Sequence, residues 1–556
     1  MKLSGSDIIV RTLIEQGCDV VFGYPGGQII NVYDSLYKYR DELRHVLTAH
    51  EQGAAHAADG YARATGKVGV VIATSGPGAT NLVTGIATAY IDSVPLVAIT
   101  GNVPTTVIGT DGFQEIDITG VTLPITKHNY FVGSIDALAD TIRDAFRLAS
   151  SGRPGPVLID VPKDVQTALY DYEPLPPVQP DPSSAAKDLR IQQAAACINE
   201  AQRPFVYFGG GLITSNAQEE LLELAEKLDA PMGCSLMGLS AVPSDHPRFL
   251  GMQGMHGHYA CSMAMHKADC IIALGARFND RVTGNRAKFA KGAKIIHIDI
   301  DGAELNKTVP AARGLRGDVK KTLQKLLPLL HEARHPEWEA QIAELRVEEK
   351  ATLDNRPGMT PRAVLEALNR HIGQNTPVAT DVGQHQMWAA QNVKFHNSRR
   401  FISSGGLGTM GFGMGAAIGA QIGSGERSVL VTGDGSFGMN LNEMATAVAE
   451  HIPMVILVMN NSVLGLVRQW QTLFFDKHYS NTMLDQRQTD FVKLAEAFGA
   501  KGSRAFTLDE LEHSLTEAFA CDGPYLIDCA IDKDEFVLPM LPPGGSVDDI
   551  IVRIGD

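Results

Sequence analysis

Short apolar runs alternate with helical patterns along the whole chain. Each run is rich in Val, Ile and Leu and is apolar at successive positions, as in strands buried on both faces of a parallel sheet. The runs are residues 68–73, 96–99, 157–161, 205–208, 270–274, 295–298, 428–431 and 454–458. The pattern predicts an α/β fold with three domains, each with a mainly parallel sheet flanked by helices. Such sheets bind ligands at the carboxyl ends of their strands.

Two stretches divide the chain. Residues 173–190 are rich in proline, which favours an extended linker. Residues 331–358 are highly charged, and we expect them to form a second, helical linker. The domains would then span residues 1–172, 191–330 and 359–556, the last with a C-terminal tail. Each is of ordinary domain size.

The amino-acid composition is ordinary except for an excess of glycine. The chain has 556 residues, with 44% hydrophobic and 20% charged residues, which is ordinary for a globular protein and excludes general disorder. Glycine is in excess, at 55 residues, or about a tenth of the chain against a usual share of about 7%. Many turns must therefore need positive φ or close backbone approach, and phosphate-binding loops are one reason for that.

Charge and cysteine content indicate which partners, cross-links and locations the chain is expected to lack. The net charge is −15 with no long basic run, so we expect neither nucleic acid nor a membrane surface as a partner. The seven cysteines are odd in number and scattered, which disfavours a disulfide framework or a zinc site. The N-terminus lacks the apolar core of a signal peptide, and the run at residues 452–459 is too short to span a bilayer. These features predict a cytoplasmic protein.

The first and last domains repeat one pattern. In each, a strand leads into a glycine-rich turn, a helix, a hydrophobic-proline pair and another strand. The turns are residues 75–78 and residues 433–436. This similarity suggests two domains of one topology. Only the second turn carries an acid, Asp434.

Asp434 has a possible partner one strand-helix-strand unit later. Asn461 follows the next strand, and 461 − 434 = 27 residues, so adjacent strands would bring both side chains to one sheet edge. Their oxygens, with nearby carbonyls, suit Mg²⁺ that carries phosphate oxygens. The alternative is turn chemistry, because Gly-Asp-Gly and Asn-Asn are common turn formers. The pairing favours the metal.

Two further patterns are weak by themselves. Residues 406–411 match G-x-G-x-x-G, but the acid that follows the next strand is Asp434, already assigned to the metal. These glycines more plausibly let a helix N-terminus approach a diphosphate. Glu51 lies in the first turn of an alanine-rich helix, where a glutamate is usually a surface residue that stabilises the helix dipole.

Taken together, these motifs resemble a known family. Glu51 within residues 50–54, Ser75-Gly76-Pro77-Gly78, and Gly433-Asp434-Gly435 with Asn461 resemble the thiamine-diphosphate-dependent enzymes, and more narrowly the catalytic (large) subunit of acetohydroxyacid (acetolactate) synthase. Further matching segments cover nearly the whole chain in order. They are residues 22–27, 109–115, 152–156, 277–284, 382–388 and 468–471. Asn279, Gln28, Gly415 and the pair Ser462-Val463 depart from the family pattern without removing a catalytic group.

The resemblance implies an activity and an assembly. Pyruvate would be decarboxylated, and its hydroxyethyl unit transferred to a second pyruvate or to 2-oxobutyrate, giving 2-acetolactate or 2-aceto-2-hydroxybutyrate in branched-chain amino-acid biosynthesis. The first domain would bind the pyrimidine of thiamine diphosphate, the last its diphosphate and Mg²⁺, and the middle one FAD. Active sites would lie at the subunit interface of a homodimer or homotetramer, with a possible small regulatory subunit.

The resemblance also implies roles for individual residues. Glu51 would share a proton with the pyrimidine, and Gly27, Phe113, Gln114 and Lys163 would line the reacting centre. Arg281 would pair with the carboxylate of the second 2-oxoacid, and Trp470 would favour 2-oxobutyrate. Alternatively, Phe113 and Trp470 could be core aromatics, and Arg281 could form a structural ion pair. Mg²⁺ would be held by Asp434, Asn461 and the carbonyl of Val463. The expected thiamine-diphosphate contacts are Glu51, Val382, Gly383, Gln384, His385, Gly408, Met410, Gly433, Asp434, Gly435, Ser436, Asn461, Leu464 and Gly465.

FAD would be a structural cofactor rather than a redox-active one. The expected positions are Arg153, Gly210, Gly211, Gly254, Met255, His256, Gly275, Arg277, Asp299 and Asp318. The triple glycine after residues 205–208 suits a strand-to-helix phosphate turn, although glycines there could merely close a tight loop.

Two alternatives stay open. One is another thiamine-diphosphate 2-oxoacid decarboxylase, carboligase or oxidase, which residues 277–284 and Trp470 disfavour. The other is a catalytically silent assembly partner, which the intact Glu51, Asp434 and Asn461 disfavour.

Overall fold

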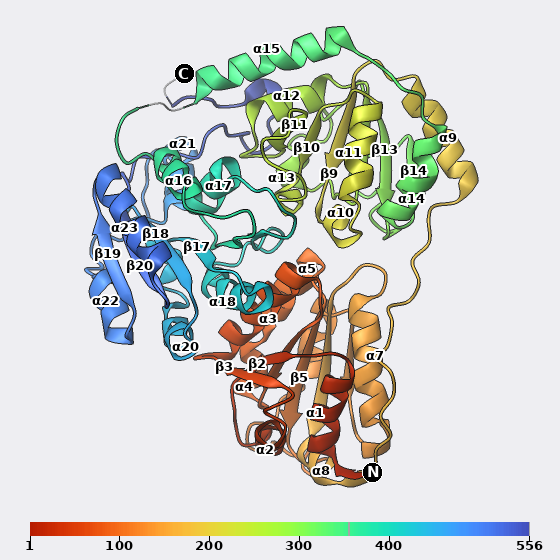
Figure 1. Ribbon diagram of the computed structural model, residues 1–556, viewed down its shortest axis with the longest axis vertical. Helices are drawn as coiled ribbons and strands as arrows, with labels where there is room; N and C mark the ends of the chain where they lie inside the picture. Colours follow the sequence, from red (N-terminus) through yellow and green to blue (C-terminus); the bar gives the residue numbers. More distant parts are fainter. Residues whose placement is uncertain (354–355, 555–556) are drawn as a thin grey trace.

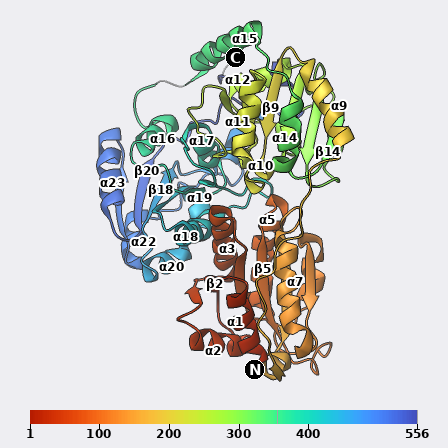
Figure 2. The ribbon, with the colours of Figure 1, turned by 45° about the vertical axis from the view of Figure 1, so that its right-hand side comes forward.

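The computed structural model describes residues 1–353 and 356–554. Within them the chain forms three six-stranded sheets, all parallel, and one two-stranded antiparallel ribbon (Figure 1). The eight apolar runs predicted as strands all lie in these sheets, so the α/β fold class is confirmed. In both views the first domain forms one end of the molecule, and the middle and third domains lie side by side at the other (Figures 1 and 2).

The first and third sheets share one topology. Numbered in chain order within each sheet, their strands run 2-1-3-4-6-5. The first sheet contains β2 (Val20–Gly23), β3 (Arg44–Leu47), β4 (Gly69–Ala73), β5 (Leu96–Asn102), β6 (His128–Phe131) and β7 (Pro156–Pro162). The third contains β15 (Val378–Thr380), β16 (Phe401–Ile402), β17 (Ser428–Gly433), β18 (Met454–Asn460), β19 (Lys501–Ala505) and β20 (Tyr525–Ala530). The repeated sequence pattern therefore reflects a repeated fold.

The middle sheet is wound differently. Its order is 3-2-1-4-5-6, which is the order of dinucleotide-binding domains. Its strands are β9 (Pro204–Phe208), β10 (Met232–Cys234), β11 (Phe249–Met252), β12 (Cys270–Leu274), β13 (Lys294–Asp299) and β14 (Arg313–Arg316).

Helices cover both faces of the first sheet. On one face, α1 (Gly5–Glu15) packs against α7 (Leu138–Ser150), and their apolar residues form one buried cluster with the sheet. On the other face, α3 (Glu51–Thr65) and α5 (Val83–Asp92) form a second cluster. The second pair also faces the third domain.

The first and third domains meet where α3 crosses α18 (Phe412–Ser424), as Figure 1 shows. The contact is between backbones. A Cβ atom added to Gly419 would lie 1.8 Å from the carbonyl oxygen of Ala57, and one added to Gly60 would lie 2.1 Å from that of Ala416. Gly415, a departure from the family pattern, is required here too, because its added Cβ would lie 2.6 Å from the carbonyl oxygen of Gly53. No ligand fits between helices this close.

The two predicted linkers differ in structure. Residues 173–187 are extended, and α9 begins at Asp188 (Asp188–Asn199). In the charged stretch, α15 (Pro336–Thr352) packs against α12 (Tyr259–Lys267) of the middle domain. Trp338 is 1% exposed and donates its indole N–H to the Pro204 carbonyl at 3.0 Å. This helix is thus anchored to the middle domain by a buried aromatic. Residues 354 and 355 of the predicted linker lie outside the described residues.

The C-terminal tail returns to the middle domain. The Leu541 amide donates to the Met255 carbonyl at 2.7 Å, and the Asn285 amide donates to the Gly545 carbonyl at 2.9 Å. The tail therefore covers the segment that contains Arg281. In the described part of the chain, no helix is both long and apolar enough to cross a membrane.

We predict that Gly419→Ala destabilises the protein by about 1–3 kcal/mol, because its methyl group would overlap the α3 backbone, which can move only if the domains separate. Thermal unfolding measures this. The control is Gly523→Ala, where an added Cβ meets nothing within 4 Å. Equal unfolding temperatures for the two variants would contradict the backbone contact.

The buried carboxyl of Asp160 on β7 makes the free energy of unfolding depend on pH. Burial raises the pKa of this carboxyl to about 7, and Thr100 and Asn102 donate hydrogen bonds to it. Because the folded protein keeps this proton longer than the unfolded chain, the contribution of Asp160 to the free energy of unfolding falls as pH rises from about 4 to about 7. Asp160→Asn stays neutral, so its unfolding temperature should rise relative to the unmodified protein across that window. A difference that is constant with pH would contradict the assignment.

Candidate functional site

Each outer sheet has one point where the strand order reverses. Loops from the two strands there leave in opposite directions and create a crevice at the carboxyl ends of the strands. In the first sheet the strands are β2 and β4, which lead into residues 24–28 and 74–78. In the third sheet they are β15 and β17, which lead into residues 381–385 and 434–436. All four loops contain residues that the sequence singled out.

Glu51 lies beside the first of these crevices. It begins α3, is 9% exposed, and its Oε2 accepts a hydrogen bond from Asn81 Nδ2 at 3.0 Å. A Cβ atom added to Gly78 would lie 3.1 Å from Glu51 Oε1. The glycine turn therefore packs directly on the carboxylate, and Asn81 fixes its orientation.

Other predicted residues gather at the same sheet edge. Lys163 Nζ donates to the Gly27 carbonyl at 3.1 Å. Gln114 has a φ of +64° and packs on Gly76, where an added Cβ would lie 3.0 Å from the Gln114 Cα. Phe113 is 85% exposed, so it is not a core aromatic. These residues form the first half-site, together with Glu51.

A second cluster forms at the edge of the third sheet. Asp434 begins α19 (Asp434–Phe437), and burial raises the pKa of its carboxyl to about 6. Asn461 Nδ2 donates to Gln384 Oε1 at 3.1 Å, and Ser436 Oγ donates to the Val382 carbonyl at 2.7 Å. The predicted proximity of the segments after β17 and β18 is thus present, and residues from the loop after β15 join them.

His385 offers an unpaired polar atom in this cluster. Its side chain is buried, burial lowers its pKa to about 3, and its Nε2 has no hydrogen-bond partner among the described residues. A Cβ added to Gly383 or Gly433 would lie within 2.8 Å of the ring, and one added to Gly465 would lie 1.9 Å from Gln384 Oε1. Three of the predicted glycines are therefore required by close packing in the cluster itself.

The donor set here fits a hard cation that brings oxygens of its own. Asp434 supplies a carboxylate and Asn461 a carboxamide, and Ser462, with φ at +55°, turns the chain toward Val463. Among the described residues no group of three His, Cys, Asp or Glu side chains is placed to hold a metal. One charged ligand with neutral oxygens suits Mg²⁺ on a diphosphate better than an all-protein metal cage.

The sequence reasoning missed Asp381. Its buried carboxylate accepts from the amides of Gly411 at 2.7 Å and Val382 at 3.1 Å, and burial raises its pKa to about 6. It therefore joins the loop after β15 to the turn that carries Gly408 and Met410. One signal was present in the sequence, since Asp381 follows β15 as Asp434 follows β17. We call the segments after β15, β17 and β18, together with the turn that carries Gly408 and Met410, the second half-site.

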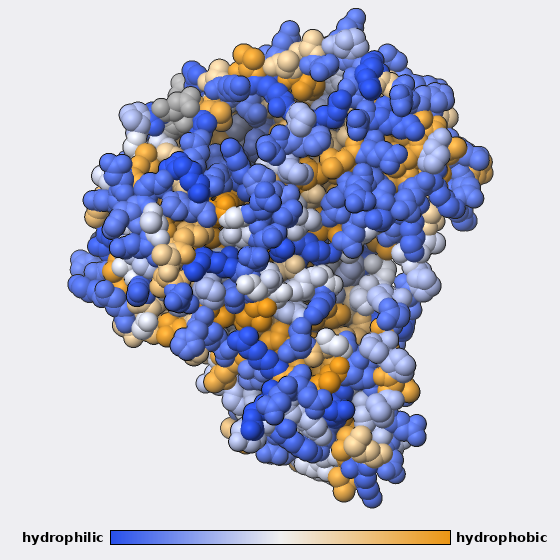
Figure 3. Space-filling view, viewed as in Figure 1, coloured by the Kyte–Doolittle hydropathy of each residue, from blue (hydrophilic) through white to orange (hydrophobic). Residues whose placement is uncertain are grey.

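The two half-sites lie in different domains of the chain. Among the described residues, no hydrogen bond joins Glu51 to the second half-site, and the α3–α18 crossing lies between the domains. Large apolar side chains at both are exposed, among them Phe113, Leu407, Met439 and Phe475. Apolar surface also interrupts the hydrophilic surface around α3 and α18 in Figure 3. Such exposure is typical of an interaction surface.

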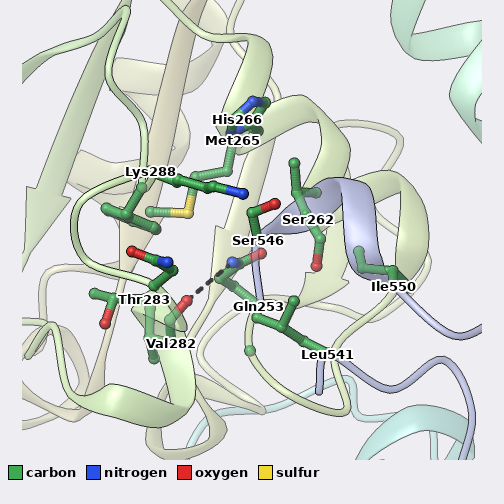
Figure 4. A pocket seen from close by; sticks show the side chains of 14 residues that line it. Gln253, Ser262, Met265, His266, Val282, Thr283, Lys288, Leu541, Ser546 and Ile550 are labelled. Atoms are coloured by element: carbon green, nitrogen blue, oxygen red, sulfur yellow. Dashed lines mark hydrogen bonds between the residues drawn. The ribbon is translucent and has the colours of Figure 1, made fainter. Parts of the chain in front are cut away.

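The two predicted substrate residues lie in different domains. Arg281 is exposed, forms an ion pair with Asp280 at 3.5 Å, and lines an open pocket together with residues 541–544 of the C-terminal tail. Trp470, on α21 (Gly465–Phe474), is half-buried against Phe474, with ring centroids 5.6 Å apart. A second pocket is also lined by Leu541, and in it the buried Gln253 donates to the Val282 carbonyl (Figure 4).

The expected FAD residues lie around the reversal point of the middle sheet. Gly210 and Gly211 follow β9, and Gly275 follows β12. An added Cβ on Gly211 would lie 2.8 Å from the Gly275 Cα, so these two glycines are needed by the loop packing alone. His256 is buried and its Nδ1 has no partner among the described residues, which fits a ligand.

The remaining expected FAD residues have varied surroundings. Arg153 pairs with Asp301 and Glu304, and Asp318 caps α14 (Val319–Leu326). Arg277 lies 3.9 Å from Asp92 of the first domain, and burial raises the pKa of Asp299 to about 6. Gly254 and Met255 lie in the loop bonded to the tail. The fit to FAD is therefore weaker than the fit to a magnesium diphosphate.

Comparison with known proteins identifies the class first. Models of the thiamine pyrophosphate enzymes match in all three domains: the N-terminal TPP binding domain at residues 3–121, the central domain at residues 191–326 and the C-terminal TPP binding domain at residues 381–529. Thiamine pyrophosphate is the compound named thiamine diphosphate above. The second half-site lies in the matched C-terminal TPP binding domain, and Gly27, Glu51, Phe113 and Gln114 of the first half-site lie in the matched N-terminal one, whereas Lys163 follows the matched residues.

Similar proteins of known name identify the family within this class of enzymes. The probable acetolactate synthase large subunit of Methanocaldococcus jannaschii is 47% identical, over 99% of this chain and 96% of its own. The acetolactate synthase isozyme 2 large subunit of Escherichia coli K12 is 46% identical, over 99% and 100%, and the large subunit of Corynebacterium glutamicum is 44% identical, over 100% and 91%. The chain belongs to the acetolactate synthase large-subunit family of thiamine pyrophosphate enzymes.

We predict that Asp434→Asn weakens Mg²⁺-dependent binding of thiamine diphosphate at least about a hundredfold, because it removes the one charged ligand of the proposed metal site. Quenching of tryptophan fluorescence during a cofactor titration, with and without Mg²⁺, measures this. Asp522→Asn, at an exposed turn of the same domain, is the control. Unchanged affinity in Asp434→Asn would exclude Asp434 as a metal ligand.

Proposed function

We propose that this chain is the catalytic subunit of an acetolactate synthase, which decarboxylates pyruvate and transfers the two-carbon unit to a second pyruvate or to 2-oxobutyrate. The observation that carries this proposal is the pair of half-sites: buried Glu51 at one strand-order reversal, and Asp434 with Asn461 at the equivalent reversal of a domain of the same topology. The names of the full-length relatives agree with it.

The second half-site would hold the charged end of the cofactor. Asp434, Asn461 and the Val463 carbonyl would bind Mg²⁺ on the diphosphate, and the unpaired Nε2 of His385 would face its oxygens. The other contacts would come from Val382, Gly383, Gln384, Gly408, Met410, Gly433, Gly435, Ser436, Leu464 and Gly465. When bound, thiamine diphosphate supplies the electron sink that 2-oxoacid decarboxylation and carbon–carbon bond formation need.

Glu51 would do the proton chemistry of the first half-site. Its carboxylate, oriented by Asn81, would hold and return a proton at the pyrimidine ring nitrogen. Gly27, Gln114 and Lys163 would line the space beside the reacting carbon, and Phe113, being exposed, would close it against a neighbouring subunit.

The second substrate would be bound under the C-terminal tail. Arg281 is exposed toward an open cavity, and its ion pair with Asp280 is solvated, so its guanidinium can pair with an incoming carboxylate. Trp470 would offer the apolar wall that favours the longer side chain of 2-oxobutyrate. The structural alternative for Arg281 loses support, because its ion pair with Asp280 is exposed.

The arrangement supports an assembly in which active sites form between chains. The α3–α18 crossing leaves no room for a cofactor between the half-sites of one chain. Each half-site would therefore meet the complementary half of a partner chain, in a homodimer or a homotetramer. FAD in the middle domain, a small regulatory subunit and a cytoplasmic location remain parts of this proposal that follow from the family resemblance.

The proposal is tested by converting Glu51 to Gln. Turnover of pyruvate should fall at least about a hundredfold, because the variant cannot take up the proton, while magnesium–thiamine diphosphate still binds within a few-fold of the original affinity. The control is Glu337→Gln, in the first turn of α15 and exposed. Unchanged acetolactate formation by the Glu51 variant would sink the mechanism.

The products separate this proposal from its alternatives. Purified protein is incubated with pyruvate, Mg²⁺ and thiamine diphosphate, with and without FAD and 2-oxobutyrate. Acetolactate and aceto-hydroxybutyrate are the expected products, whereas acetaldehyde or acetyl products would indicate a decarboxylase or an oxidase. No product at all would favour the silent assembly partner.

A further inference from the structure

Two buried carboxylates hold the backbone of the opposite domain across the interface of the first and third domains. Asp92, the last residue of α5, has a fully buried side chain. Its two oxygens accept hydrogen bonds from the amides of Gly406 at 2.8 Å and Gly405 at 3.0 Å. These glycines begin the turn that carries Gly408 and Met410. A carboxylate of the first domain thus binds the chain segment of the second half-site.

Glu443 of the third domain makes the reverse contact. It ends the short helix Leu441–Glu443, is 0% exposed, and accepts from the amides of His50 at 3.0 Å and Ala49 at 3.1 Å. The next residue is Glu51. A Cβ added to Gly53 would lie 2.0 Å from Glu443 Oε1, so the first turn of α3 closes tightly over this carboxylate.

Asp92 is itself held in place by a buried ion-pair network. Arg63 Nη2 lies 3.1 Å from Asp92 Oδ2, and Arg63 Nε lies 2.5 Å from Asp59 Oδ1. The same guanidinium donates to the Ser403 carbonyl at 2.9 Å, in the segment that leads into the turn. One guanidinium is shared by two buried carboxylates, so Arg63 neutralises Asp92 only in part, and the Gly405 and Gly406 amides supply further hydrogen bonds that the burial of Asp92 requires.

A hydroxyl pair extends this contact along the turn. Thr88 of α5 and Thr409 share a hydrogen bond of 2.7 Å between their Oγ atoms, and the Thr409 amide donates to Ser404 Oγ at 3.0 Å. Met410 is the next residue. The position of Met410 is thus set by groups on α5 as well as by its own domain.

We propose that Asp92 and Glu443 are reciprocal positioning residues, each fixing the backbone that carries the reactive groups of the opposite domain's half-site. Asp92 fixes the turn with Gly408 and Met410, and Glu443 fixes the start of α3 with Glu51. The inference rests on the proposed function for the role of those groups. The hydrogen bonds themselves are independent of it.

Two substitutions test whether these carboxylates position the backbone, because they remove the charge without changing the size of the side chain. Asp92→Asn and Glu443→Gln keep the size of each side chain but leave one backbone N–H of the opposite domain facing an amide that cannot accept from it. A buried donor without an acceptor opens more readily. Amide hydrogen exchange of the cofactor-free protein should therefore rise about tenfold at Gly405 and Gly406 in the first variant, and at Ala49 and His50 in the second.

The matched control is Asp59→Asn. Asp59 is as deeply buried as Asp92 and binds the same guanidinium, but within the described part of the chain it accepts no loop amide. It should lower the unfolding temperature comparably but raise exchange at residues 405–411 less than Asp92→Asn does, because its amide oxygen still accepts from Arg63. If Asp92→Asn does not fold, Thr88→Val replaces it, with a smaller rise expected at residues 408–411. Equal exchange at the loop in Asp92→Asn and Asp59→Asn, or in Thr88→Val and the unmodified protein, overturns the inference.

Function is measured on the same proteins. Asp92→Asn should weaken thiamine-diphosphate affinity at least about fivefold, because the cradle formed by Gly408 and Met410 shifts, while Glu443→Gln should lower kcat more than affinity. Wild-type parameters in both variants overturn the inference and leave the proposed function intact. If the unmodified protein forms no acetolactate, the proposed function fails, and exchange at the two segments still decides whether the carboxylates position them.

Discussion

The organisation of this molecule depends on one contact, the crossing of α3 and α18 with their backbones touching. Glycine at positions 60, 415 and 419 lets carbonyl oxygens of one helix approach the Cα atoms of the other more closely than any side chain would allow. Because this crossing is filled, a ligand cannot lie between α3 and α18 of the same chain. We expect both half-sites to face a partner chain, and large apolar residues near them are exposed.

Beside the crossing, buried charge is tolerated at this interface because backbone amides pair with it. Asp92 and Glu443 each accept from two consecutive amides of the opposite domain, so neither carboxylate is left unpaired. A rigid interface between domains of the same topology can therefore hold two half-sites in a fixed relation. In a symmetric pair of chains, each active site would form between the two chains. The interface between the first and third domains of one chain would then connect two active sites and contain neither.

Much of this architecture could be predicted from sequence because its signals are local. Eight apolar runs marked strands, and the spacing of Asp434 and Asn461 predicted their common sheet edge. Asp92 and Glu443 could not be found this way, since their partners are backbone amides more than three hundred positions distant and carry no side-chain signature. The helix α15 was expected as a linker, but its anchoring by Trp338 depends on a carbonyl of β9 that no periodicity encodes.

Complementation shows whether each active site takes Glu51 from one chain and Asp434 from another. Glu51→Gln and Asp434→Asn chains, each inactive alone, are mixed under conditions that exchange subunits, and hybrids are verified by distinct affinity tags. Sites shared between chains regenerate one intact site in each hybrid, so acetolactate formation should return to about a quarter of the unmodified activity after random mixing. Hybrids that form but remain inactive would contradict the account.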